Sequence, residues 1–186
     1  PCAPTMLLEL LSHTNFADMR CGSDPQFRFT IARAIYKAIL KHVAAQYGVP
    51  YRVAPLPVGR FSAELCGGDS VLLRWCGVKD SLESSAAPER YVVYTRIGDG
   101  AFDGGRIVAD TSCYVHQTPG VIYSYRVTAV NAGGESFPSE VMAACRVPDE
   151  RGRVMVINGF DRTGGPAWVK NEAVEGFVNR EDGGVP

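Results

Sequence analysis

Residues 123–140 read YSYRVTAVNAGGESFPSE, an order typical of a strand followed by a tight turn. Apolar and polar side chains alternate as far as Asn131, which is the pattern of a strand with two different faces. Gly133 and Gly134 then allow the chain to turn, and Pro138 interrupts the next extended segment because it has no backbone N–H to donate. The segment therefore predicts a strand, a turn and a second strand.

This segment is part of a longer run of short predicted strands that begins at Phe61. From Phe61 onward, turn signals recur at intervals of about 10–15 residues, which is typical of a β-sandwich. The sequence GDGAFDGG at 98–105 indicates a hairpin connection. The predicted strands are 61–65, 70–76, 90–97, 104–110, 112–117, 121–131 and 140–147.

The first 50 residues predict one strand and one helix. Residues 5–11, TMLLELL, are typical of a strand buried on both faces, and Glu9 is the carboxylate within it. The polar stretch 12–24 is predicted to be a loop that ends at Asp24, a good helix N-cap, and Gly48 supplies the helix stop. One strand and one helix cannot form a core alone, so this part is predicted to be an α/β remnant.

The fold class is therefore predicted to be mainly β, with a central sandwich between two smaller pieces. The sequence RVMVIN at 153–158 is predicted to be an apolar strand that opens a further domain, with no later segment to pair with it. The expected parts are the strand-plus-helix remnant at 1–50, a Pro-rich linker at 51–60, the sandwich at 61–148 and an incomplete additional domain at 149–186.

Composition excludes some functional classes. The chain has 186 residues, 46% hydrophobic and 21% charged, with a net charge of −1, which is a globular composition without the basic excess of a nucleic-acid-binding protein. It has no apolar run of about 18 residues, so no membrane span is predicted. None of its 6 cysteines forms a CxxC pair. Cys66 and Cys76 could bridge, or all the cysteines could be small buried thiols.

The central segment resembles a fibronectin type III domain over about residues 61–148. The resemblance is carried by TPGVIYSYRVTAVNAGGESFPSE and by the tryptophan of SVLLRWCG. It implies that Tyr123 is the corner tyrosine, with its hydroxyl bonded to nearby backbone, and that Trp75 lies in the core. Domains of this type space, orient or bind. Tyr114, Tyr125 and Phe137 could form a binding face, but packing across the sheet is the better explanation of these rings.

The first segment is similar to the end of the zinc-dependent N-acetylmuramoyl-L-alanine amidases. The resemblance rests on Glu9, Asn15 and Asp18 and on the helix that comes after them. It implies that Glu9 is the general acid/base in a complete parent enzyme that contains zinc and acts on peptidoglycan. Alternatively, Glu9 is a strand-end carboxylate without a catalytic role. His13, Glu9 and Cys21 match no zinc spacing, so no metal site and no cofactor are predicted in this chain.

The order of the three pieces resembles large Bacteroidetes surface or secreted proteins of the xanthan lyase-like or amidase-like group. The resemblance implies a secreted, periplasmic or cell-surface location. It also implies a non-catalytic spacer or binding module of a modular hydrolase, with peptidoglycan or a polysaccharide as partner. Alternatively, the sandwich is a carbohydrate- or protein-binding module of a xanthan lyase-like protein. Asn158, Asp161 and Arg162 are either ligand contacts past a strand end or an exposed loop.

Overall fold

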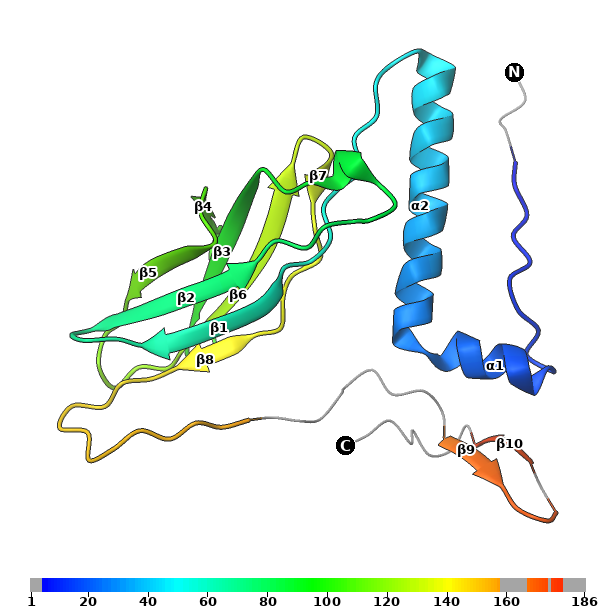
Figure 1. Cartoon of the computed structure of the whole chain (residues 1–186). Coiled ribbons are helices and arrows are strands. Elements are labelled where there is room, and N and C mark those ends of the chain that lie inside the picture. Colours follow the sequence, from blue (N-terminus) through cyan, green and yellow to red (C-terminus); the bar gives the residue numbers. More distant parts are fainter. Residues whose placement is uncertain (1–4, 158–166, 174, 179–186) are drawn as a thin grey trace. The chain divides into compact units, whose positions relative to one another are not determined.

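A computed structural model describes residues 5–157, 167–173 and 175–178 (Figure 1). The chain divides into two compact units, Leu40–Val154 and a second made of Pro1–Ile39 with Met155–Pro186. The helices are α1 (Phe16–Ser23) and α2 (Pro25–Tyr47), with a short 3₁₀ helix η1 (Ser84–Ala86). The strands are β1 (Gly59–Leu65), β2 (Ser70–Cys76), β3 (Arg90–Ile97), β4 (Arg106–Val108), β5 (Ser112–His116), β6 (Tyr123–Asn131), β7 (Gly134–Glu135), β8 (Met142–Ala144), β9 (Ala167–Lys170) and β10 (Glu175–Val178).

Eight of these strands, β1 to β8, form two antiparallel sheets. One sheet has the order β1-β2-β5, and the other has the order β4-β3-β6-β7, with β8 also paired to β6. Two such sheets with these crossovers are the arrangement of a fibronectin type III sandwich. The predicted mainly β fold class is confirmed. The predicted strands 70–76 and 90–97 coincide with β2 and β3.

The serines after β7 explain how the sheet continues past a proline. The Ser136 and Ser139 backbone N–H groups donate to carbonyls of β6, at 2.8 Å each. Their hydroxyls accept from the β6 N–H groups of Ala129 at 2.9 Å and of Val127 at 3.0 Å. Side-chain oxygens thus replace backbone acceptors on either side of Pro138. The edge strand is therefore split into β7 and β8 without leaving β6 unpaired.

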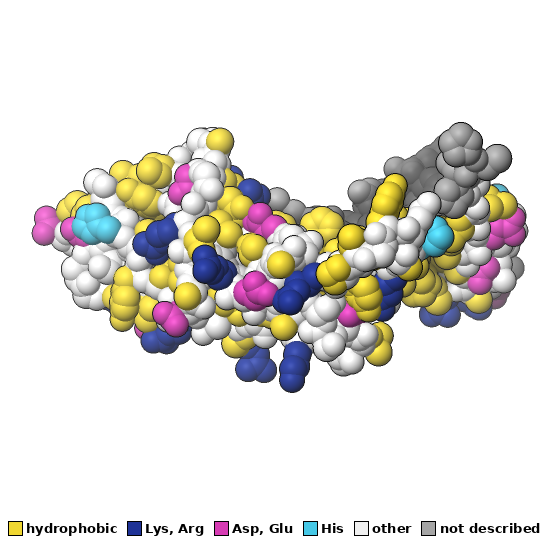
Figure 2. Space-filling model, turned by 90° about the horizontal axis from the view of Figure 1, so that it is seen from above, with side chains coloured by type: hydrophobic (Ala, Val, Ile, Leu, Met, Phe, Trp, Pro, Cys, Tyr) yellow, Lys and Arg dark blue, Asp and Glu magenta, His cyan; other side chains and the backbone are white. Residues whose placement is uncertain are grey.

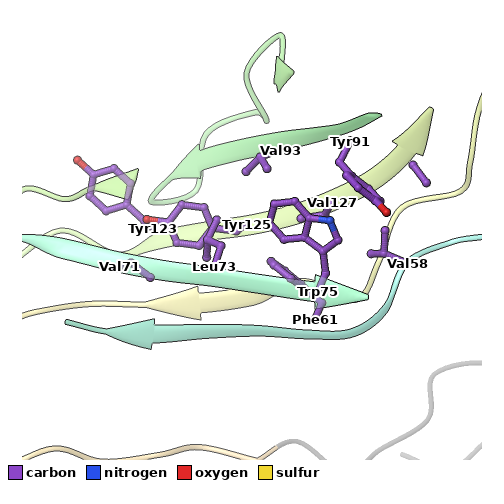
Figure 3. Close-up of a cluster of buried hydrophobic side chains, with 11 residues drawn as sticks. Val58, Phe61, Val71, Leu73, Trp75, Tyr91, Val93, Tyr123, Tyr125 and Val127 are labelled. Atoms are coloured by element: carbon purple, nitrogen blue, oxygen red, sulfur yellow. The ribbon is translucent and has the colours of Figure 1, made fainter. Parts of the chain in front are cut away.

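The core of the sandwich is aromatic at its centre (Figure 3). Trp75 of β2 is 3% exposed and makes edge contacts with Phe61, at a centroid distance of 6.5 Å, and with Tyr91, at 5.5 Å. This placement confirms the prediction that Trp75 lies in the core. The other buried members of the cluster are Val58, Val71, Leu73, Val93, Tyr123, Tyr125, Val127 and Ala129.

Tyr123 forms the predicted corner at the start of β6. Its hydroxyl accepts from the Thr118 backbone N–H at 3.2 Å and lies 3.3 Å from the Thr118 hydroxyl. Gly120 lies between them in the sequence with a φ of 80°, a conformation that glycine adopts without steric cost. The hydroxyl thus fastens the turn before β6 to the strand itself.

Two predictions for the first 24 residues are wrong. Residues 5–12 form no strand, and Leu7 is 82% exposed. The physical reason is that a lone strand gains its hydrogen bonds and its burial only from neighbouring strands. The predicted loop 12–24 instead contains α1, because the Asn15 side chain accepts from the Ala17 and Asp18 N–H groups and caps the helix.

The ends of α2 agree with the predicted helix signals. The Asp24 carboxylate accepts from the Gln26 N–H at 2.9 Å, which makes Asp24 the N-cap. At the other end Gly48 has a φ of 64°, and the Val49 N–H donates to the Ala44 carbonyl at 3.0 Å. This is the Schellman arrangement that ends a helix at glycine.

The C-terminal segment also differs from its prediction. Residues 153–157 are not a strand, and Val154 is 91% exposed. The pairing occurs further along, where β9 and β10 form an antiparallel two-stranded sheet. The strand prediction is wrong for 153–157 because an apolar composition alone does not supply the partner that a strand needs. Asn158, Asp161 and Arg162 lie outside the described residues.

Candidate functional site

The segment predicted to be a linker, 51–60, packs on the sandwich rather than standing apart from it. Val53 is 0% exposed, Pro55 is among the largest fully buried side chains, and Val58 belongs to the core cluster. Only the end of the segment is in a strand, at β1. We name residues 51–58, with the side chains that hold them, the junction, because through it the chain enters the sandwich from α2.

Asn131 fixes the junction to the end of β6. Its side-chain amide donates to the carbonyls of Val53 at 2.9 Å, Ser85 at 3.1 Å and Ala87 at 3.2 Å. Its carbonyl oxygen accepts from the Gly133 N–H at 2.7 Å. The side chain is buried, so both polar atoms of the amide are satisfied within the protein. One residue thereby joins the junction, η1 and the turn after β6.

Gly133 allows the turn to approach the junction closely. A Cβ atom at this position would collide with the Arg52 carbonyl oxygen and would lie 2.9 Å from the carbonyl carbon of Val53. Both neighbours are backbone atoms, which cannot move aside cheaply. The glycine that was predicted to serve the turn therefore also permits the junction to pack.

Glu83 connects the junction with the last turns of α2. Its carboxylate lies 2.9 Å from the Lys41 ammonium and accepts from the Ser85 hydroxyl at 2.8 Å. The same hydroxyl accepts from the Val53 N–H at 3.2 Å. Glu83 is 7% exposed, so this carboxylate is nearly buried and partnered on both oxygens. Lys41 also lies over the Tyr51 ring, 5.2 Å from its centroid.

The junction is expected to lose stability in acid. The hydrogen bond from Lys41, and then that from Ser85, lowers the pKa of the Glu83 carboxyl below its ordinary 4.5. Because the pKa of Glu83 is lower in the folded protein, its carboxylate contributes fully to the stability of the fold above pH 4.5. That contribution is lost as pH falls through the lowered pKa. We expect Glu83→Gln to have a lower free energy of unfolding than wild type at about pH 7. This difference in unfolding free energy should shrink as pH falls to about 3.

A difference that stays constant over that pH range would contradict this role of Glu83. The matched control is Glu140→Gln, which removes an exposed carboxylate from the same unit.

The same ion pair predicts a loss of stability at high pH. The hydrogen bond to Glu83 raises the pKa of Lys41 above 10.5. The charged Lys41 therefore contributes to the stability of the fold below pH 10.5, and this contribution is lost only as pH rises through the raised pKa.

Two of the first-segment residues on which the predicted amidase resemblance rests, Asn15 and Asp18, stabilise the start of α1. Asn15 caps α1, and the Asp18 carboxylate accepts from the Ser12 N–H at 3.0 Å. Glu9 is exposed, as are His13 and Cys21. Among the residues that the structure describes, no group of three His, Cys, Asp or Glu side chains is placed to hold a metal ion. The donor set of a zinc amidase therefore does not arise from these residues.

The predicted aromatic binding face does not exist as a single surface. Tyr125 is 0% exposed, and its hydroxyl accepts from the Gln117 side chain at 2.8 Å. Burial raises the pKa of Tyr125 to about 12. Tyr114 is paired with Leu72 in the other sheet and is 63% exposed, and Phe137 is 71% exposed. The prediction for Tyr125 is wrong, because the alternation that places Tyr123 and Val127 inside places it inside as well.

The described cysteines are free thiols. They are Cys21, Cys66, Cys76, Cys113 and Cys145. Cys66 and Cys76 do not bridge. Cys21 and Cys76 are exposed, so the alternative expectation of buried thiols is wrong for these two residues. Burial raises the pKa of the Cys113 thiol, which keeps it in the unreactive protonated form.

The surface carries charges of both signs. On the face seen in Figure 2, Lys and Arg side chains are interspersed with Asp and Glu side chains, and hydrophobic side chains lie between them. Within the described part of the chain, no helix has the combined length and apolar character of a membrane span.

The sequence does not predict the roles of Asn131 and Glu83 in the junction. Asn131 was recognised only as the end of a strand, although its position before AGG is a signal for a side chain that folds back on its own turn. Glu83 lies in SLESSAAPER, where no periodicity marks it, so its pairing with Lys41 is visible only in three dimensions.

No protein-family model matches the chain, and no curated protein matches it. Solved structures similar to it include the twitchin kinase region of C. elegans, with a TM-score of 0.46 and 22% identity over 63% of this chain and 22% of that one. A structure of titin kinase and its flanking domains has a TM-score of 0.42 and 22% identity, over 50% of this chain and 17% of that one.

A fibronectin type III domain from a human protein is also similar. It has a TM-score of 0.42 and 19% identity, over 55% of this chain and 85% of that one. The chain thus spans less than a quarter of the twitchin and titin structures. The strand order and the Tyr123 corner carry the fold assignment, and these likenesses add no function to it.

Proposed function

We propose that this chain is a non-catalytic spacer of a modular hydrolase. The observation that supports it is the junction, in which Asn131 and Glu83 fix residues 51–58 to the sandwich. A spacer that sets the orientation of a neighbouring domain needs an entry segment that is fixed to its own sandwich. A buried polar network whose hydrogen bonds are all satisfied restricts motion of the entry segment relative to the sandwich. Fibronectin type III sandwiches commonly serve to space and orient, without a catalytic site of their own.

The parent is proposed to be a zinc-dependent N-acetylmuramoyl-L-alanine amidase-like enzyme, secreted, periplasmic or at the cell surface. The support is the order of Glu9, Asn15 and Asp18 before a long helix. In that parent Glu9 would accept a proton from the attacking water and pass it to the leaving amine of L-alanine. The zinc ligands would come from elsewhere in the parent, because the described residues offer no suitable set.

Glu9→Gln tests this proposal in the complete gene product. We expect it to lower the release of peptide amines from peptidoglycan by about 10²–10⁴-fold, the usual contribution of a general acid/base. Zinc content and thermal unfolding should be unchanged, since Glu9 is exposed and glutamine has nearly the same shape. Glu140→Gln is the matched control, and turnover retained by Glu9→Gln would remove the catalytic role of Glu9.

A binding module for a polysaccharide or for peptidoglycan is the second candidate. It is favoured by the exposed rings of Tyr114 and Phe137, which are 63% and 71% exposed. Cosedimentation of the chain with insoluble peptidoglycan separates the two functions. A spacer stays in solution, whereas a binding module sediments and is released when Tyr114 is replaced by alanine.

A further inference from the structure

Two arginines and two aromatic rings form a stack on the outer face of β3 and β6. We name Tyr94, Arg96, Phe102 and Arg126 the arginine face. The guanidinium carbon of Arg126 lies 5.0 Å from the centroid of the Tyr94 ring and 4.3 Å from that of the Phe102 ring. The guanidinium carbon of Arg96 lies 5.2 Å from the Phe102 centroid. Contact with ring faces holds both cations in place.

The strand register brings these side chains together. Tyr94 of β3 lies opposite Arg126 of β6, and Arg96 lies opposite Ser124, so the two arginines are diagonal neighbours on one face. An isolated bridge between Arg96 and Phe102 folds the loop after β3 back onto that strand. The arrangement thus results from backbone pairing and does not depend on flexible side chains finding each other.

The two guanidinium groups, those of Arg96 and Arg126, have no ion-paired carboxylate among the described residues. Glu135 lies on the same face, but one of its oxygens accepts from both Tyr94 and Thr128 hydroxyls, at 2.6 Å each. Two neighbouring like charges repel each other, and an added anion would relieve that repulsion. This surface is therefore complementary to a negatively charged partner.

The guanidinium N–H groups that can still donate determine which kind of anion fits the arginine face. The Nε–H groups of Arg96 and Arg126 are buried and have no hydrogen-bond partner, so an incoming group meets the outer Nη atoms. One Nη of Arg96 donates to the Ser124 hydroxyl at 3.2 Å, which orients that guanidinium. A carboxylate can accept two parallel N–H bonds from the end of a guanidinium, which suits this presentation.

The surroundings favour a peptide over a sugar. Ile107 of β4 is paired with Val92, on the same face, and is 64% exposed. A protein partner can offer an apolar side chain next to a carboxylate, as the cores and rims of protein interfaces do. A sugar ring would stack on an open aromatic face, but guanidinium groups already lie over Phe102 and Tyr94.

We propose that the arginine face binds an extended acidic peptide segment of a partner protein, with carboxylates on Arg96 and Arg126 and an apolar side chain on Ile107. This surface is separate from the junction, so its role does not depend on the proposed function. Because the site is partly open to solvent, binding should weaken with rising salt.

Titration of the isotope-labelled chain with an acetylated extended pentapeptide tests the proposal by NMR, with glutamate at positions 1 and 3, leucine at position 5 and alanine between them, so that these three side chains share one face. We expect signals of Arg96, Phe102 and Arg126 to shift together, and Arg126→Ala to weaken binding by about tenfold or more. Arg126→Lys keeps the charge without the planar fork and should also weaken binding. Arg74→Ala, which removes an exposed arginine of the other sheet, should change nothing. Thermal unfolding of each variant confirms that the sandwich is intact.

Three outcomes would overturn the proposal. The peptide could leave the arginine face unshifted, or Arg74→Ala could weaken binding as much as Arg126→Ala, which would indicate general attraction to positive charge. Alternatively, polygalacturonate could shift these signals while the peptide does not, which would assign the face to an acidic glycan.

Discussion

Replacing Trp75 with alanine is expected to lower the free energy of unfolding of the sandwich by about 3–5 kcal/mol, the usual cost of removing a large core aromatic. The indole is 3% exposed and makes edge contacts with Phe61 and Tyr91, so its removal opens a cavity between the sheets. Chemical denaturation followed by circular dichroism measures the change. A cooperative transition close to that of wild type would contradict the assignment of Trp75 to the centre of the core.

Trp75→Phe is the matched variant for this prediction. It keeps an aromatic ring in place and removes the indole N–H, which is buried and has no hydrogen-bond partner. Losing a donor that makes no bond is not costly, so the remaining loss comes from ring volume. We expect about 1–2 kcal/mol, well below the loss for alanine.

Replacing Asn131 with alanine is expected to destabilise the sandwich by about 2–4 kcal/mol, because several buried polar groups lose their partner at once. The amide donates to three carbonyls, of Val53, Ser85 and Ala87, and its oxygen accepts from Gly133. The loss should be concentrated in the junction. Amide hydrogen exchange should therefore accelerate at Val53 more than at Val93 in the middle of β3.

Asn131→Asp is a sharper version of the same test. It keeps the size of the side chain and the acceptor for Gly133, but it replaces the amide donor by an oxygen that faces three carbonyls. Repulsion between these oxygens should make Asp at least as destabilising as Ala. If aspartate is tolerated without loss of stability, the amide does not hold the junction.

The sandwich could be predicted from the sequence because its signals are local. Alternation over 123–131 and the turn residues after it specify a strand and its end, and Trp75 marks the core. The strands β4 and β8 are shorter than predicted, because a strand extends only as far as its neighbour pairs with it.

The parts that could not be predicted depend on distant partners. The amide of Asn131 reaches the carbonyl of Val53, 78 residues earlier, and nothing in either local sequence requires that contact. The apolar run 5–11 shows the opposite case, in which a local pattern predicts a strand that the structure does not form. Its composition suits a buried strand, but composition does not provide the neighbours that would bury it. The arginine face was not predicted because its two arginines come from two different strands and one of its rings, Phe102, comes from a loop.

Backbone order parameters of the junction test the central claim most directly. We claim that residues 51–58 are fixed on the sandwich and are not a free linker. NMR relaxation should then give the N–H groups of Val53, Leu56 and Val58 order parameters of about 0.85, as expected for a rigid backbone such as β3. Values below about 0.6 at these residues would show a flexible tether and would contradict the spacer function proposed for this chain.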